Sequence, residues 1–198
     1  MIAVIDYKAG NLTSVIKALD ALDCQATVTA DPEVVRTAEK VILPGVGHFQ
    51  ATQLLADSGL TAAIGDSIAR GVPFLGICVG LQWLFEGSTE APATKGLGFF
   101  RGQCERFSAA VKVPHVGWNQ VRVNPASRLM QGVDDCAFVY YTHSYRAPVI
   151  NETVAVTEYE GGFSGAVECG NVMGVQFHPE KSGSAGMRVL RNFVEPAC

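Results

Sequence analysis

The chain has 198 residues, of which 48% are hydrophobic and 17% are charged, and its formal net charge is −4 at neutral pH. This much apolar material predicts a folded domain with a large core and excludes disorder as the overall class. The sequence lacks the clustered basic patch that nucleic-acid binding needs, and no apolar run is long enough to span a bilayer.

The first half of the chain alternates between two kinds of pattern. Apolar, strand-like runs occupy residues 2–6, 25–30, 40–45 and 72–78. Helical patterns separate and follow them, at residues 11–22, 31–35, 49–59, 60–71 and 79–87. Strands that alternate with helices predict an α/β fold with an open, mostly parallel wound sheet and helices on both faces.

The second half changes character. Strand-like segments divided by turn residues fall at residues 96–107, 120–123, 137–147, 152–161, 163–170 and 171–177, before a last helix at 184–194. They predict an antiparallel layer of strands added to the parallel sheet. Because no repeat or linker interrupts the pattern, we expect one domain over residues 1–198.

Six cysteines are scattered along the chain, at Cys24, Cys78, Cys104, Cys136, Cys169 and Cys198. None forms a C-x-x-C pair, and no secretory leader precedes the first strand, so reduced thiols and a cytosolic protein are expected. No His or Cys pair has the spacing of a zinc site. We therefore expect no metal.

The segment GICVG, residues 76–80, has the pattern of a nucleophile elbow with a cysteine at its corner. Gly76 and Gly80 would leave room for a sharp turn from strand to helix. Unpaired N–H groups at the helix start would favour the Cys78 thiolate, and the N–H of Val79 could bind an oxyanion. The alternative is that Cys78 is a small buried hydrophobe.

A base for this thiol is offered by His178 in the segment GVQFHPEKS. Glu180 follows two positions later, so in extended chain both side chains project to the same face. Pro179 would stiffen the link between them. Glu180 could then orient the imidazole toward the sulfur, although a solvated turn is the plainer interpretation.

A third predicted strand ends in the segment PGVG, residues 44–47. Carboxyl ends of parallel strands gather at one edge of a sheet, which is where ligands bind in open α/β folds. Gly45 and Gly47 would let backbone N–H groups approach a substrate closely. An ordinary tight turn is the alternative for both glycines.

GICVGLQ and VQFHPEKS, in this order, resemble the class I glutamine amidotransferases, whose triad is Cys-His-Glu. The segments IDYKAGNL, LPGVGHF, VPHVGWN and YYTHSYRA are similar to a narrower group, the glutaminase subunits of imidazole glycerol phosphate synthases. This resemblance covers essentially the whole chain.

The resemblance implies that Cys78 attacks glutamine, that His178 moves the protons and that Glu180 orients His178. The implied oxyanion hole consists of Gly45, Val46 and Val79. Glutamine would bind between Gly47, Gln82, His143, Ser144 and Tyr145. No cofactor is implied.

The resemblance also implies a partner, a cyclase subunit with a (β/α)8 barrel that forms a heterodimer with this chain and receives its ammonia. Four positions match residues that face such a partner: Asn11, Trp118, Asn119 and Lys181. Trp118 could instead be core and Lys181 a solvated charge. For His48 and His115 a structural role is expected.

Two alternatives remain at this point. The chain could serve another synthase, of anthranilate, GMP, carbamoyl phosphate or pyridoxal phosphate, with the same triad. It could also be a redox-sensing or chaperone-like protein with a reactive thiol at Cys78. PGVG and PHVGWN favour the histidine pathway, and the HPE segment argues against a sensor, which needs no oriented base.

Overall fold

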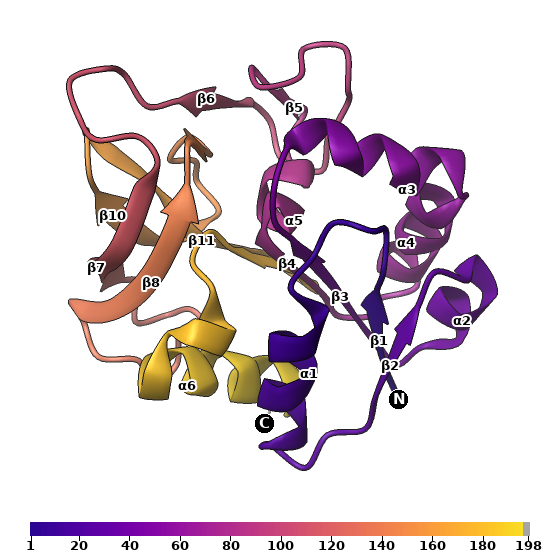
Figure 1. Cartoon of the computed structure of the whole chain (residues 1–198). Coiled ribbons are helices and arrows are strands. Elements are labelled where there is room, and N and C mark those ends of the chain that lie inside the picture. The colour runs from indigo at the N-terminus through magenta and orange to yellow at the C-terminus, as the bar shows by residue number, and fades with distance from the viewer. Residues whose placement is uncertain (196–198) are drawn as a thin grey trace.

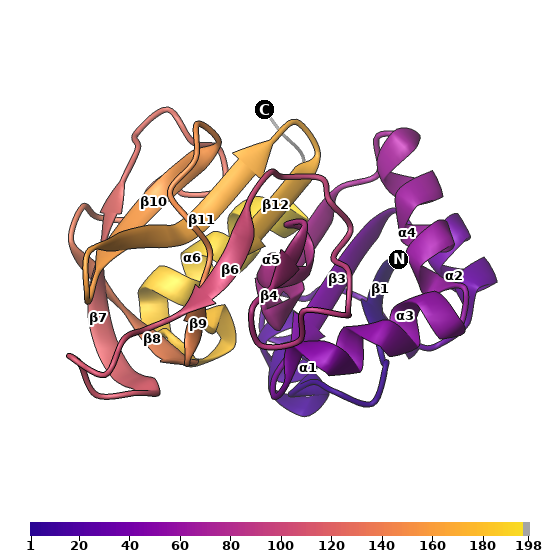
Figure 2. The same ribbon diagram turned by 90° about the horizontal axis from the view of Figure 1, so that it is seen from above.

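A computed structural model describes residues 1–195 of the chain. Its main element is a nine-stranded sheet with the order β2-β1-β3-β4-β12-β11-β10-β7-β8, shown in two views in Figures 1 and 2. These strands are β1 (Ile2–Ile5), β2 (Ala26–Thr29), β3 (Lys40–Gly45), β4 (Phe74–Cys78), β7 (His115–Val123), β8 (Ala137–His143), β10 (Thr153–Glu158), β11 (Gly162–Cys169) and β12 (Val172–Val175). A small sheet contains β5 (Gly87–Ser88), β6 (Gln103–Arg106) and β9 (Tyr145–Arg146).

Helices cover both faces of the parallel half of the sheet. They are α1 (Leu12–Asp20), α2 (Pro32–Thr37), α3 (Gln53–Asp57), α4 (Leu60–Ala69), α5 (Val79–Trp83) and α6 (Gly183–Val194), with 3-10 turns η1 (Phe49–Thr52) and η2 (Pro179–Lys181). Helices α1 and α6 pack against one another on one side, and α2, α3 and α4 pack together on the other (Figure 1). None of the helices in the described chain is long and apolar enough to cross a membrane.

The strands of the parallel half are nearly continuously apolar because both of their faces are covered. Every residue of β1, β4 and β12 is buried. The neighbouring pairs β2–β1, β1–β3, β3–β4 and β4–β12 are all parallel. This burial gives the site a rigid floor, since each strand is held by neighbours on both sides.

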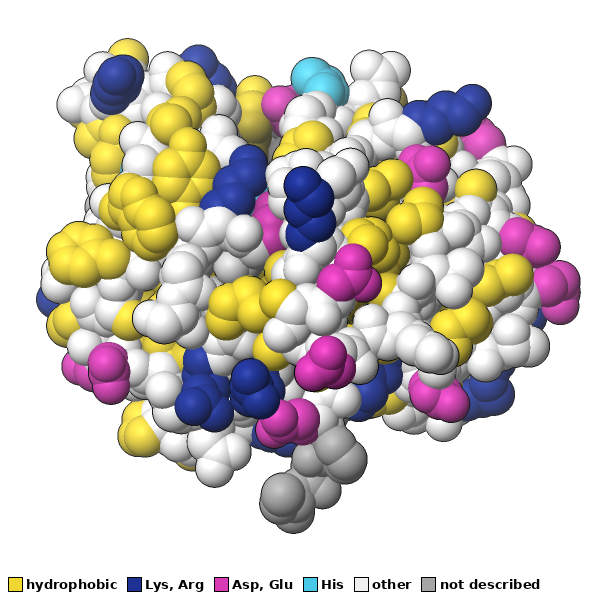
Figure 3. Space-filling view, turned by 60° about the horizontal axis from the view of Figure 1, so that its bottom comes forward, with side chains coloured by type: hydrophobic (Ala, Val, Ile, Leu, Met, Phe, Trp, Pro, Cys, Tyr) yellow, Lys and Arg dark blue, Asp and Glu magenta, His cyan; other side chains and the backbone are white. Residues whose placement is uncertain are grey.

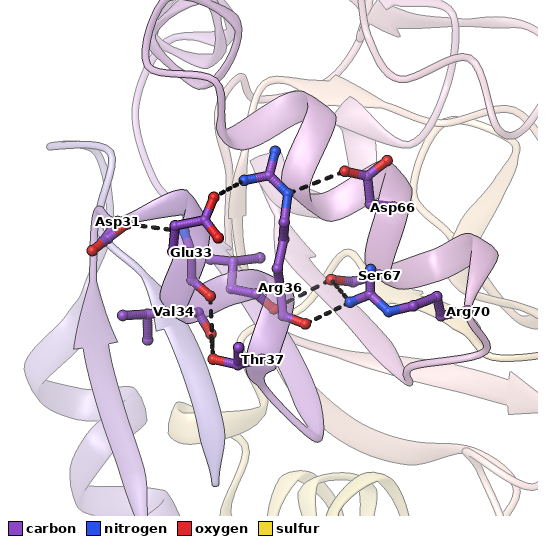
Figure 4. Close-up of polar contacts among 9 residues, drawn as sticks. Asp31, Glu33, Val34, Arg36, Thr37, Asp66, Ser67 and Arg70 are labelled. Carbon is purple, nitrogen blue, oxygen red and sulfur yellow. Dashed lines mark hydrogen bonds and ion pairs between the residues drawn. The ribbon is translucent and has the colours of Figure 1, made fainter.

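Polar contacts tie α2 to α4 at the surface of this half (Figure 4). The Asp31 carboxylate caps α2 by accepting from the Glu33 N–H at 2.9 Å. The Arg36 guanidinium donates to Asp66 of α4 at 3.1 Å, and Arg70, which follows α4, donates to the Arg36 carbonyl at 2.6 Å. The sequence signal for α2, a capping Asp followed by proline, therefore predicted this helix correctly.

The α/β class and the wound sheet are confirmed, and the antiparallel strands are joined to it more directly than expected. β11, β10, β7 and β8 hydrogen-bond in antiparallel fashion onto the edge at β12, so they extend the same sheet. The two halves thus share one continuous backbone network rather than stacking as separate layers.

The helix expected over residues 79–87 ends earlier, since α5 stops at Trp83. The carbonyls of Trp83, Leu84 and Phe85 accept instead from the N–H groups of Leu97, Phe100 and Gly98. The loop after α5 therefore takes the acceptors that another helical turn would use, which sequence periodicity alone does not reveal.

The described cysteines are free thiols: Cys24, Cys78, Cys104, Cys136 and Cys169. Cys198 lies outside the described residues.

Candidate active site

The segment GICVG forms a tight elbow between β4 and α5. Cys78, the last residue of β4, has φ +55° and ψ −106°, a backbone conformation that costs roughly 1–3 kcal/mol in a non-glycine residue. A Cβ added to Gly76 would lie 2.4 Å from the Gly80 carbonyl oxygen, and one added to Gly80 would lie 2.0 Å from the Leu43 carbonyl oxygen. Only glycines permit this close approach, so the expected role of Gly76 and Gly80 is confirmed.

The ends of three adjacent strands meet at this elbow. In the parallel register Gly45 of β3 is the partner of Cys78, while Val175 of β12 is the partner of Ile77. The chain that leaves β12 therefore reaches His178 beside the elbow, as expected for carboxyl ends at one edge of a parallel sheet.

His178 and Glu180 form a buried pair. Nδ1 of His178 lies 2.9 Å from Oε1 of Glu180, and their side chains are 2% and 1% exposed. Because a carboxylate only accepts, the proton of this hydrogen bond belongs to Nδ1. Nε2 is thereby left as the ring nitrogen available to the sulfur.

The electrostatics of His178 reflect the nearby thiol. Burial would lower the pKa of the imidazole, but the Cys78 sulfur and the Glu180 carboxylate outweigh burial and raise it to about 9. Nε2 is buried and has no hydrogen bond of normal geometry to any described residue. The Cys78 sulfur thus acts on the ring electrostatically, and catalytic hydrogen bonds are often long or poorly aligned in free enzymes.

The turn that carries His178 is bonded to β8. The backbone N–H of His178 donates to the Tyr140 carbonyl at 2.9 Å. The Ser182 hydroxyl donates to the His178 carbonyl at 2.6 Å and accepts from the Tyr140 N–H at 2.9 Å. The position of the imidazole is therefore set by the antiparallel half of the sheet.

A pocket of about 230 Å³ opens above Cys78. Its lining residues are Gly47, Cys78, Val79, Gln82, Glu90, Pro114, Thr142, His143, Ser144 and Tyr145. All five residues expected to bind substrate are among them, together with the elbow residues Cys78 and Val79.

Glu90, Pro114 and Thr142 of this lining were not predicted from the sequence. Glu90 lies in the loop after β5. Its carboxylate accepts a hydrogen bond from the Phe49 N–H at 2.7 Å, which holds the side chain in place. Glu90 stands in the loop STEAPAT, where a lone carboxylate carries no recognisable signal.

Gly45 and Val46 do not line the pocket. Gly45 lies beneath the elbow, where an added Cβ would be 2.6 Å from the Tyr7 hydroxyl and 2.8 Å from Cβ of Val79. The Tyr7 hydroxyl is buried and makes no hydrogen bond within the described chain. Its pKa is raised by burial and by the nearby Cys78.

Three of the four residues expected to face a partner lie near one another. Trp118 is 55% exposed and packs edge-on against Tyr140, with ring centroids 5.9 Å apart. Lys181 places its Nζ 5.8 Å from the same Tyr140 ring. Asn11 precedes α1, which packs against the η2 turn that carries Lys181.

Asn119 differs from this expectation. It follows Trp118 in β7, and successive side chains of a strand point to opposite faces. Its amide donates to the Glu158 carbonyl at 3.0 Å and lies 3.4 Å from Nε2 of His115. Asn119 is half-buried and hydrogen-bonds to residues of the inner face of the sheet, so it lies on the other side of β7 from Trp118.

The outer face of β7 and β8 carries several exposed apolar side chains. Val116, Trp118 and Phe138 are 54%, 55% and 56% exposed, and Trp118 is paired across the strands with Tyr140. Figure 3 shows hydrophobic side chains gathered on the side where β7 and β8 lie in Figure 1. We call Val116, Trp118, Phe138 and Tyr140 the outer β7–β8 face.

The structural interpretation of His48 and His115 agrees with their surroundings. His48 is exposed, and its Nδ1 accepts from the Gln50 N–H at 3.1 Å at the start of η1. His115 is buried and stacks on Tyr159, with ring centroids 3.9 Å apart. Within residues 1–195, no group of three or more His, Cys, Asp or Glu side chains could hold a metal ion.

Comparisons with known proteins agree on one family. The family described as "Glutamine amidotransferase class-I" matches residues 3–197. Imidazole glycerol phosphate synthase subunit HisH of Thermococcus kodakarensis is 49% identical and covers 98% of both chains. The subunit of the same name from Moorella thermoacetica is 48% identical, covering 98% of this chain and 94% of its own.

Solved structures show the same fold at lower identity. A "Crystal structure of glutamine amidotransferase" superposes with a TM-score of 0.77 at 19% identity, covering 98% of this chain and 97% of the other. PurLQS from Thermotoga maritima gives a TM-score of 0.74 at 19% identity, with 98% and 96% covered.

Proposed function

Because this chain belongs to the class-I glutamine amidotransferases and, within them, to the HisH subunits of imidazole glycerol phosphate synthase, we propose how its residues release ammonia from glutamine. The observation that carries the proposal is the meeting of three groups. Cys78 sits at a strained elbow under the pocket, and the buried His178–Glu180 pair lies beside its sulfur.

In the first half of the reaction the Cys78 sulfur attacks the carboxamide carbon of glutamine, forming a C–S bond and an oxyanion. His178, whose pKa of about 9 keeps its imidazole protonated at neutral pH, gives its Nε2 proton to the leaving nitrogen. The C–N bond breaks, ammonia departs, and a γ-glutamyl thioester remains on Cys78.

In the second half neutral His178 takes a proton from water, and the water oxygen attacks the thioester carbonyl. The C–S bond then breaks, glutamate leaves and the sulfur becomes a thiolate again. Glu180 holds the imidazole in the same orientation throughout. The N–H of Val79, which lines the pocket, is the oxyanion donor of this proposal. A backbone N–H of the Gly45–Val46 segment joins it only if that segment turns toward the pocket, since neither residue lines it.

The pocket supports a single amino acid as substrate. Its volume of about 230 Å³ is below the roughly 300–1,000 Å³ typical of drug-sized ligands, which suits a substrate as small as glutamine. The Glu90 carboxylate supplies a negative charge suited to the α-ammonium group of glutamine. Gly47, Gln82 and the segment 143–145 complete the proposed substrate contacts.

Ammonia released here must avoid protonation by bulk water, which favours a second subunit docked near the pocket. We assign this docking to the outer β7–β8 face with Lys181 and Asn11, since exposed apolar patches rimmed by polar residues mark interfaces. The partner proposed is a cyclase with a (β/α)8 barrel, which would use the ammonia to form imidazole glycerol phosphate and aminoimidazole carboxamide ribotide.

The experiment uses the chain co-expressed with the cyclase subunit of its own organism. Cys78→Ala should abolish turnover with glutamine while leaving turnover with ammonium salts within about twofold, because ammonia is consumed at a separate site. Cys169→Ser, which changes an exposed thiol, is the matched control and should leave both activities intact. Full glutamine turnover in Cys78→Ala would refute the assignment of the nucleophile.

A further inference from the structure

Gln176 lies between β12 and His178 and is completely buried. Its Nε2 donates to Sγ of Cys78 at 3.6 Å, an ordinary length for a hydrogen bond to sulfur. Its Oε1 accepts from Nε2 of Gln82 at 3.1 Å. Both ends of this buried amide are therefore occupied, one of them by the atom that reacts.

The hydrogen bonds of Gln82 decide which end of the Gln176 amide faces the sulfur. Nε2 of Gln82 also donates to the Tyr145 carbonyl at 2.9 Å, and a carbonyl can only accept. The NH2 end of Gln82 is thus fixed by Tyr145, so Gln176 must present oxygen to Gln82. Its N–H then points to Cys78. If the Gln176 amide were flipped, its NH2 group would face the NH2 group of Gln82, and neither group could accept a hydrogen bond.

The Tyr145 carbonyl is itself held from the other side. It accepts from Nδ1 of His143 at 2.8 Å, which puts the His143 proton on Nδ1. Nε2 of His143 must then accept from Nδ1 of His115, 3.1 Å away. Nε2 of His115 is left to accept from the Asn119 amide at 3.4 Å. Every link has one donor and one acceptor.

Both histidines of this network fit the neutral state that these directions require. Burial lowers the pKa of His115 to about 4 and that of His143 to about 3. His115 is also clamped between the rings of Tyr141 and Tyr159, with centroids 4.9 Å and 3.9 Å away. The groups that link Asn119 to Gln176 are therefore all uncharged.

We propose that Gln176 is a further catalytic residue, whose side-chain N–H stabilises the Cys78 thiolate and holds the sulfur toward the pocket. The network through Gln82, Tyr145, His143 and His115 fixes the direction of that N–H. This inference rests on the proposed function of Cys78 as the nucleophile.

Gln176 adds something that the charged neighbours of Cys78 do not. The titratable groups near the sulfur are His178 and Tyr7, and Glu90, His143 and Tyr145 line the same pocket. His178 changes its protonation state during the reaction, since it gives a proton to the leaving nitrogen and later takes one from water. The neutral amide of Gln176 keeps its N–H throughout, because it does not titrate.

The test is the rate of alkylation of Cys78 by iodoacetamide as a function of pH, followed by mass spectrometry of the Cys78 peptide in the full chain. Gln176→Leu should move the midpoint of this pH profile upward by about one unit, a tenfold loss of thiolate near neutral pH. In the complex with the cyclase subunit, kcat for glutamine should fall about tenfold while KM changes less than twofold.

Gln82→Met provides a second variant should Gln176→Leu fail to fold by circular dichroism. It releases Gln176 to rotate, so the midpoint should move in the same direction by a smaller amount. Gln103→Leu, at an exposed position of β6, is the matched control and should leave the midpoint unchanged.

An unchanged midpoint in folded Gln176→Leu, or in Gln82→Met where only that variant folds, would overturn the inference. The alkylation profile needs no glutamine, so it reports on this hydrogen bond even if the wild-type complex hydrolyses none. A wild-type complex that hydrolyses no glutamine would instead refute the proposed function.

Discussion

Nδ1 of His178 lies 2.9 Å from Oε1 of Glu180, and the pair is almost entirely shielded from solvent. The carboxylate fixes both the tautomer and the direction of the ring, so that Nε2 is the nitrogen left for the sulfur of Cys78. Orientation of the base thus depends on the 3-10 turn η2, which brings Glu180 back to the His178 ring.

Glu180→Gln should lower kcat for glutamine by about 100-fold or more, because the amide loses the negative charge and can hold the wrong tautomer. KM should change less than threefold, since Glu180 does not line the pocket. Steady-state glutaminase assays of the complex measure both, with Glu195→Gln at the exposed end of α6 as control. A rise in KM as large as the fall in kcat would instead indicate direct contact with substrate.

Gly80→Ala should destabilise the chain by about 1–3 kcal/mol, because its methyl group would meet the Leu43 carbonyl oxygen at 2.0 Å. Gly65→Ala is the matched control, since a Cβ there meets nothing within 4 Å and the site lies inside α4. Alanine at that position should stabilise by about 0.5–1 kcal/mol. Urea unfolding distinguishes the two, and equal effects would contradict the described elbow.

Acid should destabilise the chain through its buried histidines. The pKa of His115 falls from 6.5 to about 4 on folding, so between these values the unfolded chain binds more protons than the folded one. Stability therefore decreases as the pH falls from 6.5 toward 4, by up to about 1.4 kcal/mol per pH unit for each such histidine.

His115→Phe keeps an aromatic ring between Tyr141 and Tyr159 but cannot titrate. The pH slope of its unfolding free energy should be smaller than that of the wild type by about one proton over this window. Urea titrations at several pH values between 7 and 4 give the slopes. His48→Gln, at an exposed position, should retain the wild-type slope, and an unaltered slope in His115→Phe would argue against a neutral buried imidazole.

Trp118→Ala should weaken binding of the cyclase subunit by about 30-fold, the equivalent of roughly 2 kcal/mol for a central aromatic contact. Titration calorimetry measures the change. Val149→Ala removes an equally exposed hydrophobic side chain away from the outer β7–β8 face and should bind normally. Equal weakening by both variants would exclude that face as the docking surface.

Local sequence signals predicted most of the secondary-structure elements of the fold. β3 runs from Lys40 to Gly45 as expected, and α2 begins after its predicted cap at Asp31. Periodicity could not give the end of α5, because the acceptors beyond Trp83 are taken by a loop that follows later in the chain. It also could not show that the antiparallel strands attach at the β12 edge.

The catalytic residues could be predicted because reactive side chains stand in short, recognisable sequence motifs. Cys78 stands in a segment whose glycines have a physical meaning. His178 and Glu180 do pair, but through the 3-10 turn η2 and not through the extended chain expected from their spacing. Glu90 and Tyr7 reach the site only through tertiary packing, and no local pattern marks them. The position of Gln176, two residues before His178, could have suggested that it lies near the site. Its contact with Cys78 could not be predicted, because the sequence does not show which groups a buried glutamine bonds.

The backbone N–H of His178 donates a hydrogen bond to the carbonyl of Tyr140, a residue whose ring lies on the outside of β8. One peptide hydrogen bond therefore joins the strand that carries the outer β7–β8 face to the buried base of the site. A substitution on the exterior of β8 that moves the backbone at Tyr140 would therefore also shift the imidazole of His178.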